Sequence, residues 1–573
     1  MDRHAVAHVL EQIASFIDLK GGDSKFRVRA FRNAAHAVED FEGDLEDAVA
    51  SGELLKVKGI GKATFDVVRE LVTEGRSSYL ETLRADVPEG LVEMLRIGGL
   101  GMARIRLLHE KLGVRSIAEL EAAARDGRLA KLPRFGPKSA ERVLRGIAYL
   151  RRTGEQYLLY HALRQAGRLA GLIRSLPGVT SAEVAGSVRR RLELVRDIDI
   201  AVATADPGAL ADRLASLPTV REVIGRGDPR FAVQFHSGVP ARIHTAPPHL
   251  FGHLLARATG SRAHLEALRR VASGRGLGLD EHGMTRGGTP IPCPDESALY
   301  SALGMPVIPP ELREGSNEVE LALEGRLPRL LERDDLLGLL HCHTSYSDGT
   351  NTVAELAAGC LAAGYRYVGV TDHSETASYA GGLTEEDLVR QHEEIDAYNR
   401  SQGDVVVLKG IEADIRADGS LDYSPEFLDR FDFVIASIHS RFEMGREAMT
   451  ERMLRALDDP HTSIIGHPTG RLLLARDPYD VDIGALIERA AQRGAALEIN
   501  ADPHRLDLGW RHCIEARRAE VPISIGADAH SIAGLEYVEL GVAMARKAGL
   551  EKQHVLNTRD VEGFLRHAQA RRR

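Results

Sequence analysis

Two histidines and an aspartate stand close together after an apolar run in the second half of the chain. Residues 336–349 read LLGLLHCHTSYSDG, so His341 and His343 are one residue apart and Asp348 follows five residues later. Strand side chains alternate between two faces, so both imidazoles should point the same way. This pairing is suited to binding a metal ion. The alternative is two surface histidines near a turn.

The pattern recurs at six further apolar runs, each of which carries or precedes a histidine or a carboxylate. These runs are 367–370, 405–408, 433–438, 464–465, 495–499 and 523–525. Helix-like stretches at 352–363, 385–398 and 483–493 lie between them. Strands that alternate with helices predict parallel strands in an α/β barrel or sheet. In a barrel, the carboxyl ends of the strands converge on one active site.

Mixed imidazole and carboxylate donors at these strand ends favour Zn, Mn or Fe over Ca or Mg. Nine donors are too many for one ion and predict a cluster of two or three. Such clusters hydrolyse phosphoesters by activating water and stabilising the attacking and leaving oxygens. The predicted ligands are His341, His343, Asp348, His373, Glu412, His439, His467, Asp528 and His530.

On these motifs, residues 336–550 resemble the PHP (polymerase and histidinol phosphatase) domain. The resemblance implies a distorted (β/α)7 barrel with a trinuclear metal site, in which Glu412 takes the place of the bridging carboxylate. It also implies catalytic roles for Glu412, His439 and His467. Arg471 and the stretch 500–507 (NADPHRLD) either contact phosphate or form a salt bridge at the barrel rim.

The length, composition and net charge of the chain exclude several classes of protein. A chain of 573 residues, 43% hydrophobic and 27% charged, predicts several soluble domains. No apolar run is long enough to span a membrane, and the amphipathic start lacks a secretory cleavage site. Four scattered cysteines favour a reducing, cytoplasmic setting. The net charge of −9 argues against a uniformly basic nucleic-acid binder, so DNA contacts must come from local patches.

Residues 1–155 are predicted to be helical, and the same sequence pattern occurs three times in them, at 55–68, 95–108 and 132–144. Each repeat has an apolar residue, a short glycine-containing hairpin and a helix start, which resembles the helix-hairpin-helix motif. Glycines let the backbone approach DNA, and amides at a helix start hold phosphate. Glycine turns that merely link helices, and a solvated basic face, are the alternatives. The predicted DNA-binding residues are Lys25, Arg29, Gly59, Gly61, Lys62, Gly99, Gly101, Gly136 and Lys138.

A second stretch with residues suited to catalysis, GSVRRRLELVRDIDIAVA, spans residues 186–203. Asp197 and Asp199 alternate on a strand and can share a divalent cation, Mg or Mn. With TGSRAHLEALRR at 259–270, this stretch resembles the palm and thumb of family X DNA polymerases. The resemblance implies a dNTP as a further ligand and catalytic roles for both aspartates. It assigns nucleotide and phosphate contacts to Gly186, Ser187, Arg190, Gly260, Ser261 and Arg269.

Four positions depart from that family's nucleotide pocket. Arg242 stands where the palm's third catalytic Asp is expected, within VPARIHTAPP. Two-metal transfer needs that carboxylate to hold the ion that activates the primer hydroxyl. The other departures are Arg196 for a Gly, Arg257-Ala258 for a Tyr-Phe pair, and Leu265 for an Asn. We therefore expect weak or absent nucleotidyl transfer.

The domain order resembles that of bacterial family X polymerases with a C-terminal PHP domain. We expect a monomeric, multidomain α/β protein of DNA repair that binds gapped or nicked DNA and 3′ ends. Its PHP domain would act as a metal-dependent 3′–5′ exonuclease. The alternatives are an active gap-filling polymerase with a PHP proofreading nuclease, and a non-catalytic DNA-end-binding scaffold. An isolated PHP barrel could also be a small-molecule phosphatase, but the hairpin repeats argue against that for the whole chain.

The expected divisions follow from these motifs and from composition. The C-terminal 566–573 (RHAQARRR) is expected to be a solvated tail. The predicted domains are an N-terminal helical DNA-binding domain at 1–80, a fingers-like helical domain at 81–155, the palm at 156–248, the thumb at 249–315, a linker at 316–335 and the PHP domain at 336–573.

Overall fold

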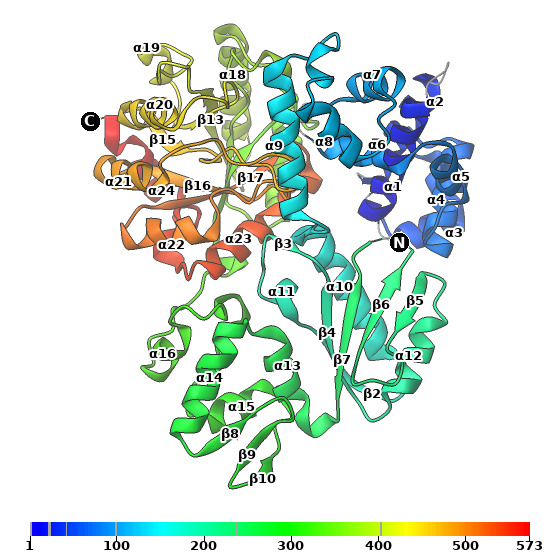
Figure 1. The fold of residues 1–573 in the computed structure, drawn as a ribbon. Helices are drawn as coiled ribbons and strands as arrows, with labels where there is room; N and C mark the ends of the chain where they lie inside the picture. The colour runs from blue at the N-terminus through cyan, green and yellow to red at the C-terminus, as the bar shows by residue number, and fades with distance from the viewer. Residues whose placement is uncertain are drawn as a thin grey trace. The chain divides into compact units, whose positions relative to one another are not determined.

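Seven parallel strands in the C-terminal half close into a barrel in the computed structural model (Figure 1). The structure describes residues 3–20, 25–39, 41, 43–97, 100–236, 238–401 and 404–572. Each barrel strand pairs with its neighbours in sequence, and β11 closes the barrel on β17. This confirms the predicted (β/α)7 architecture. The strands are β11 (Gly338–Cys342), β12 (Tyr367–Val370), β13 (Val406–Asp414), β14 (Phe433–Ser437), β15 (Thr462–Ile465), β16 (Ala496–Asn500) and β17 (Ile523–Ala529).

Helices cover the outside of the barrel, which explains why its strands read as nearly continuous apolar runs. Most strand residues are buried on both faces. Strand β13 is longer than the predicted run, so Glu412 lies within the strand rather than after it. The helices are α17 (Val353–Ala362), α18 (Glu385–Ser401), α19 (Pro425–Leu428), α20 (Arg446–Asp458), α21 (Ile483–Arg493), α22 (Trp510–Arg518), α23 (Val538–Lys547) and α24 (Val561–Gln569).

Helix α24 closes the amino end of the barrel. Phe564 of α24 packs against Tyr367 and Phe433, the first residues of β12 and β14, with ring centroids 5.8 and 5.2 Å away. These rings belong to an apolar core with Leu340 and Ile464. The opposite, carboxyl end is thereby left for polar side chains.

The expectation of a solvated C-terminal tail is wrong for Arg571 and Arg572, whereas Arg566 is exposed as expected. The Arg571 guanidinium contacts the carbonyls of Leu457 and Thr462, and Arg572 donates to the Phe431 carbonyl at 2.7 Å. The Leu457 carbonyl lies in the last turn of α20, where carbonyls lack intrahelical partners and a cation is favourable. Arg571 and Arg572 therefore pair with backbone carbonyls instead of remaining in solvent.

The chain divides into two compact units, Met1–Val307 with Leu474–Arg476 and Ile308–Leu473 with Asp477–Arg573. The predicted linker 316–335 therefore belongs to the second unit. Just before it, Glu311 pairs with Arg546 at 2.7 Å and Glu314 with Lys547 at 2.5 Å, both on α23. The other predicted domain limits remain predictions.

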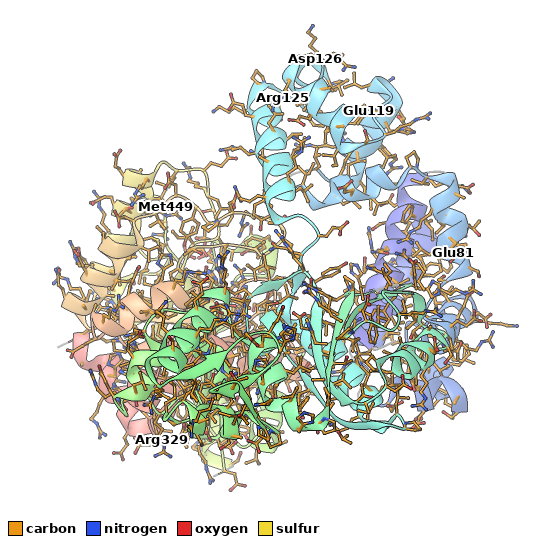
Figure 2. All side chains as sticks on the ribbon, turned by 60° about the horizontal axis from the view of Figure 1, so that its bottom comes forward. Glu81, Glu119, Arg125, Asp126, Arg329 and Met449 are labelled. Atoms are coloured by element: carbon orange, nitrogen blue, oxygen red, sulfur yellow. The ribbon has the colours of Figure 1, made fainter. Side chains whose placement is uncertain are left out.

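The first unit begins with helices around one apolar core. Glu119, Arg125 and Asp126, labelled in Figure 2, are exposed on and just beyond α8. The helices are α1 (Arg3–Lys20), α2 (Lys25–Glu39), α3 (Leu45–Ser51), α4 (Lys62–Glu74), α5 (Ser78–Asp86), α6 (Glu89–Glu93), α7 (Met102–Leu112), α8 (Ile117–Arg125) and α9 (Pro137–Thr153).

A mixed five-stranded sheet of order β2-β4-β7-β6-β5 follows. Only its central pair, β4 and β7, is parallel. A smaller antiparallel sheet of β8, β9 and β10 comes next. No helix among the described residues, in this region or elsewhere in the chain, is long and apolar enough to cross a membrane. The elements are α10 (Leu159–Ser175), β2 (Val179–Val184), α11 (Gly186–Arg189), β4 (Ile198–Thr204), α12 (Pro207–Ala215), β5 (Val220–Ile224), β6 (Arg230–Phe235), β7 (Ala241–Ala246), α13 (Phe251–Thr259), α14 (Arg262–Gly274), β8 (Leu277–Leu279), β9 (Met284–Arg286), β10 (Thr289–Ile291) and α15 (Glu296–Ala302).

Candidate metal centre and related sites

All nine predicted ligands meet at the carboxyl end of the barrel. They form four overlapping groups whose donor atoms lie within 4.8 Å of one another. The groups are His343, Asp348, His373 and His530; His341, Glu412 and His467; His341, His343 and Asp528; and His373, Glu412 and His439. The sequence therefore located the residues that the structure brings together. Their role as ligands remains a prediction.

Glu412 lies at the centre of this cluster and is 1% exposed. Its carboxylate oxygens are 2.9 Å from His373 Nδ1 and His467 Nε2, and 3.3 Å from His341 Nε2 and His439 Nε2. Burial alone would raise the pKa of this carboxyl, but the surrounding imidazoles hold the pKa well below its usual value. One carboxylate thus stands between four histidines.

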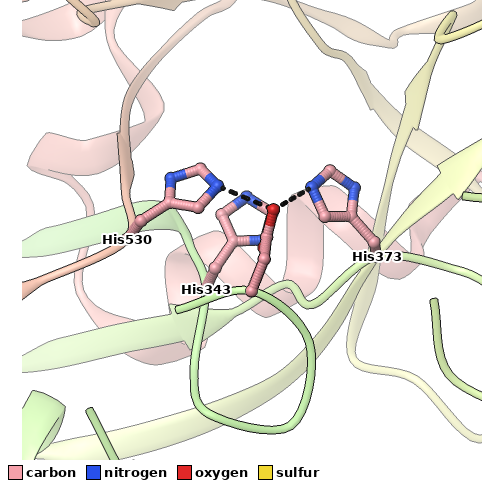
Figure 3. A group of neighbouring side chains, drawn as sticks. His343, His373 and His530 are labelled. Carbon is pink, nitrogen blue, oxygen red and sulfur yellow. Dashed lines mark ion pairs between the residues drawn. The ribbon is translucent and has the colours of Figure 1, made fainter. Parts of the chain in front are cut away.

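Asp348 forms a second group nearer to solvent, where its side chain is 33% exposed. Its Oδ2 is 3.4 Å from His530 Nε2 and 3.6 Å from His373 Nε2. Figure 3 shows His343, His373 and His530 gathered around one carboxylate. The imidazole of His343 also lies 3.2 Å from Asp528, which links this group to the buried one.

The backbone at three of these positions departs from regular strand geometry. His341, His467 and Asp528 have φ values of 63°, 26° and 50°, in a region that residues other than glycine seldom adopt. The register of β11 also shifts between Leu339 and Cys342. His341 and His343 do face one site, as their spacing predicts, but across an irregular backbone. Local strain of this kind gathers at functional sites.

Several buried atoms of the centre lack a hydrogen-bond partner, among them His341 Nε2, His373 Nδ1 and Glu412 Oε2. The last two lie 2.9 Å apart, yet they are not aligned as donor and acceptor. Leaving buried polar atoms unpaired costs free energy. Donors that face a common point at this spacing fit a shared cation, and imidazole with carboxylate is the ligand set of Zn, Mn and Fe.

Two carboxylates that we did not predict as site residues orient the histidines. Glu498 Oε1 lies 2.6 Å from His341 Nδ1, and its Oε2 accepts the His467 amide at 2.7 Å. Asp414 Oδ1 lies 2.5 Å from His439 Nδ1. Such contacts fix which ring nitrogen is free to bind a metal. Asp414 follows Glu412 by two residues, so strand alternation could have placed it on the same face.

Replacing Glu498 with glutamine should weaken metal binding by about 10- to 100-fold, the usual effect of losing a carboxylate that orients a metal-binding histidine. A neutral amide oxygen accepts the His341 Nδ1 hydrogen bond more weakly than a carboxylate oxygen does. The imidazole is then less firmly oriented and becomes a weaker metal ligand. Titration calorimetry with Mn²⁺ measures the change. Glu488→Gln, at an exposed carboxylate of α21, is the matched control. Equal affinities in the two variants would contradict the orienting role.

Four histidines of the centre carry raised pKa values in the metal-free protein, and the pKa of His341, beside Glu498 and Glu412, is one of them. Burial alone would lower the pKa of each, but the neighbouring carboxylates outweigh burial. Glu412 and Asp348 raise the pKa of His373 to about 10, and Glu412 with Asp414 raises that of His439 to about 9. Asp348 and Asp528 raise the pKa of His530 to about 9. These imidazoles therefore hold protons at neutral pH, which a metal ion must displace.

The metal-free second unit should lose stability as the pH rises from 7 to 10. A histidine whose pKa is raised by folding contributes stability that is complete below its unfolded value of about 6.5 and lost as the pH passes the folded value. The urea midpoint after chelation, followed by fluorescence, reports this change. The chain has one tryptophan, Trp510, which is buried on α22 of this unit.

Two controls accompany the pH series. Saturating Mn²⁺ should flatten the fall, because bound imidazoles have already lost their protons. Asp348→Asn should also reduce it, because this variant removes a carboxylate that raises the pKa of both His373 and His530. A midpoint that is constant or rises between pH 7 and 10 would contradict the assignment of protons.

Within the stretch 500–507, considered for phosphate contact, Arg505 lies at the metal centre. Its Nε is 3.5 Å from Asp528 Oδ2, and its side chain is 21% exposed. Arg471 instead donates to the Arg505 carbonyl at 2.9 Å and contacts the Leu506 carbonyl. Arg471 thus holds the loop that carries Arg505.

The palm carboxylates Asp197 and Asp199 face an internal cation. Asp199 on β4 pairs in register with Arg242 on the parallel neighbour β7. The Arg242 guanidinium contacts the Asp197 carboxylate, and its Nε lies 3.8 Å from Asp199 Oδ1. His244 Nε2 lies 2.8 Å from the same Asp199 oxygen. The space that the two aspartates would offer to a metal ion is thus bordered by positive or protonatable groups.

The predicted phosphate-binding segments lie side by side. Arg190 donates to the Thr259 carbonyl at 2.6 Å, next to Gly260 and Ser261. Gly186 has φ 61°, and a Cβ there would lie 2.0 Å from Asp199 Oδ2, so only glycine fits. Ser187 follows it in α11, Ser261 caps α14, and Arg269 is exposed on α14. Their contacts with a ligand remain a prediction.

The described residues of the three helix-hairpin-helix repeats share one order of elements. A 3₁₀ turn (Glu53–Lys56, Met94–Arg96 or Leu129–Lys131) precedes α4, α7 or α9. The helix N-caps are Gly61, Gly101 and Gly136, and a Cβ built on any of them would have no neighbour within 4 Å. The backbone is therefore open to a ligand at three helix starts.

Five other predicted DNA-binding residues belong to the first hairpin, to two of these helix starts and to α2. Gly59 has φ 103°, which favours glycine in the first hairpin. Lys62 and Lys138 are exposed in the first turns of α4 and α9, and Lys25 and Arg29 are exposed on α2. Gly99 lies outside the described residues. DNA binding at these positions remains a prediction.

Comparisons with known proteins cover both units. Family models match residues 1–77 (helix-hairpin-helix domain), 91–148 (SAM-like helix-hairpin-helix tandem), 254–314 (DNA polymerase beta thumb) and 340–502 (PHP domain). A probable phosphatase of Caldicellulosiruptor saccharolyticus is 31% identical over 200 residues, which cover 33% of this chain and 78% of that protein.

A protein of Bacillus subtilis, DNA polymerase/3'-5' exonuclease PolX, is 38% identical over 575 residues. The match covers 99% of this chain and 100% of that protein. It runs through the hairpin repeats, the palm, the thumb and the barrel, which confirms the resemblance found in the sequence. The chain belongs to the family X DNA polymerases that carry a C-terminal PHP domain.

Proposed function

We propose that this protein acts in DNA repair as a metal-dependent 3′–5′ exonuclease whose PHP centre hydrolyses phosphodiesters at 3′ ends. The observation that carries the proposal is that nine predicted ligands meet at the carboxyl end of the barrel, with Glu412 between four of the histidines. The name of the Bacillus relative supports this reaction and its direction.

The donor set suits two or three ions of Mn or Zn. Such ions would polarise the phosphoryl oxygens and acidify a water molecule. The chain itself holds the donors in place, with Glu498 orienting His341 and Asp414 orienting His439. Glu412, His439 and His467 are the proposed catalytic residues because they face the middle of the cluster. Arg505 adds a positive charge for the phosphate at the same place.

The first unit would grip gapped or nicked DNA. The open helix starts at Gly61, Gly101 and Gly136 suit phosphates of either strand and carry no base preference. The palm and thumb would hold the primer terminus through Arg190 and the segment 259–261. Repeated backbone contact of this kind favours a DNA enzyme over a phosphatase of small molecules, because a phosphate monoester needs no such grip.

We further propose that nucleotidyl transfer is weak or absent. Arg242 reaches both palm aspartates and so competes with the metal ions that the reaction needs. Asp197 and Asp199 remain in place, and they keep an active gap-filling polymerase as the rival, with Mg or Mn and a dNTP in the palm.

One assay tests the exonuclease against its rivals. A 5′-labelled primer on a one-nucleotide gap is incubated with Mn²⁺, with and without dNTPs. We expect a ladder that shortens from the 3′ end, is unaffected by dNTPs and disappears after chelation. A lengthened product would establish the polymerase. Binding without hydrolysis under every condition would establish a DNA-end-binding scaffold.

We place the protein in the cytoplasm as a monomer. All four cysteines are buried thiols without a disulfide, which suits a reducing compartment. Light scattering of the purified chain checks the oligomeric state.

A further inference from the structure

Tyr379 is an exposed aromatic side chain beside the metal centre. Its ring centroid lies 6.2 Å from those of both His373 and His439, two of the predicted ligands, and the side chain is 69% exposed. In the described residues of the second unit, 308–401, 404–473 and 477–572, no other aromatic side chain (phenylalanine, tyrosine or tryptophan) is exposed. The ring therefore stands where it can pack against a ligand bound at the centre.

The loop that carries Tyr379 is held by several hydrogen bonds. The Thr376 amide donates to Asp422 at 2.8 Å, the Glu375 amide to the Tyr423 hydroxyl at 3.1 Å, and the Leu383 amide to the His373 carbonyl at 2.9 Å. Tyr379 itself lies in a 3₁₀ turn, Ser378–Ala380. The backbone therefore presents the ring at a defined place, and little order would have to be gained when a ligand packs on it.

The position of this ring matches one part of a DNA substrate. A scissile phosphate at the cluster places the 3′-terminal nucleotide beside it, and the base of that nucleotide is the part with a flat face. Base–aromatic stacking accepts any of the four bases, because each has a π-face. The face of an unpaired terminal base is free for such a contact. Arg505 lies near the same donors and would serve the phosphate rather than the base.

We infer that Tyr379 stacks on the base of the 3′-terminal nucleotide at the PHP centre, and that it does so whichever of the four bases is present. This inference rests on the proposed exonuclease function and adds to it the part of the substrate that is recognised. Tyr379 would be a substrate-binding residue, and its ring rather than its hydroxyl would make the contact.

The test compares two single-stranded, 5′-labelled oligonucleotides that differ only at the 3′ end. One ends in an ordinary nucleotide, and the other ends in an abasic tetrahydrofuran residue. The rate of the first cleavage is measured in Mn²⁺ for the unchanged chain, Tyr379→Ala and Tyr379→Phe. We expect Tyr379→Ala to lower kcat/KM on the ordinary end by about five- to 150-fold, mainly through KM. It should leave cleavage of the abasic end unchanged, and Tyr379→Phe should retain activity on both.

Leu361→Ala is the matched control, because Leu361 is also an exposed hydrophobic residue of this unit. It lies near the end of α17, which leads into the amino end of β12 and hence to the other end of the barrel. Equal losses on the two oligonucleotides, or no loss in Tyr379→Ala, would overturn the stacking contact while leaving the exonuclease established. If the unchanged chain cleaved neither oligonucleotide, the proposed function would fail, and the inference with it.

Discussion

Replacing Glu412 with glutamine is expected to lower the exonuclease rate by about a thousandfold or more and to reduce the metal content of the purified protein. Four imidazoles approach the two oxygens of this one carboxylate within 3.3 Å. An amide keeps the shape but removes the negative charge and one acceptor oxygen. Losing one preorganised electrostatic group typically costs 100- to 1,000-fold in rate, about 3–4 kcal/mol, and Glu412 serves several donors at once. Cleavage of the labelled primer in Mn²⁺ and metal analysis by mass spectrometry measure both effects.

Two further variants make this result interpretable. Glu393→Gln changes an exposed carboxylate on α18 and should leave rate and metal content unchanged. Asp348→Asn alters the solvent-exposed group of the centre and should lower the rate even if Glu412→Gln proves poorly folded. Trp510 fluorescence checks the fold of the unit in each case. Activity in Glu412→Gln close to that of the unchanged chain would exclude the cluster as the nuclease site.

Replacing Arg242 with aspartate is expected to raise primer extension by about a hundredfold or more. The change exchanges a cation for an anion beside Asp197 and Asp199. At a separation of about 4 Å and an effective dielectric of about 20, one pair of unit charges is worth about 4 kcal/mol, and a divalent ion feels the exchange more strongly. The expected gain is therefore conservative. Extension of the gapped primer with Mg²⁺ and dNTPs measures it.

Arg242→Ala separates the two parts of this effect. It removes the guanidinium without supplying a third carboxylate, so it should improve metal binding in the palm but restore less extension than Arg242→Asp. Equal extension by both variants would show that repulsion of the metal ions by Arg242 is by itself enough to suppress nucleotidyl transfer. No gain in either would mean that Arg242 does not stand in the place of the third carboxylate, although it lies beside Asp199 in the sheet.

Much of the centre could be predicted because its residues come shortly after apolar runs that recur along the chain and form strands. His373, His439 and His467 each come just after a buried run, and parallel strands of a closed barrel bring such positions to one end. The arginine beside the palm aspartates could also be placed, because the two strands are neighbours in the sheet that the motif implied.

Other features depend on contacts between residues that are far apart in the chain. The sequence shows Glu498 in a strand, but its bond to His341 spans 157 residues and exists only once β11 and β16 belong to one barrel. The basic C-terminal residues looked solvated, since nothing local shows that the end of α20 offers them carbonyl groups. Asp414 could have been found by alternation from Glu412, but not its pairing with His439.

The sequence by itself therefore determined the family, the barrel and which residues meet at its carboxyl end, because these follow from residue types and spacing along strands and helices. Only the tertiary structure decided which carboxylate orients which imidazole, that Arg242 reaches both palm aspartates, and that the Tyr379 ring stands exposed beside the centre. The physical reason is that hydrogen bonding, burial and charge act through space within a few ångströms. Spacing along the chain does not specify those distances.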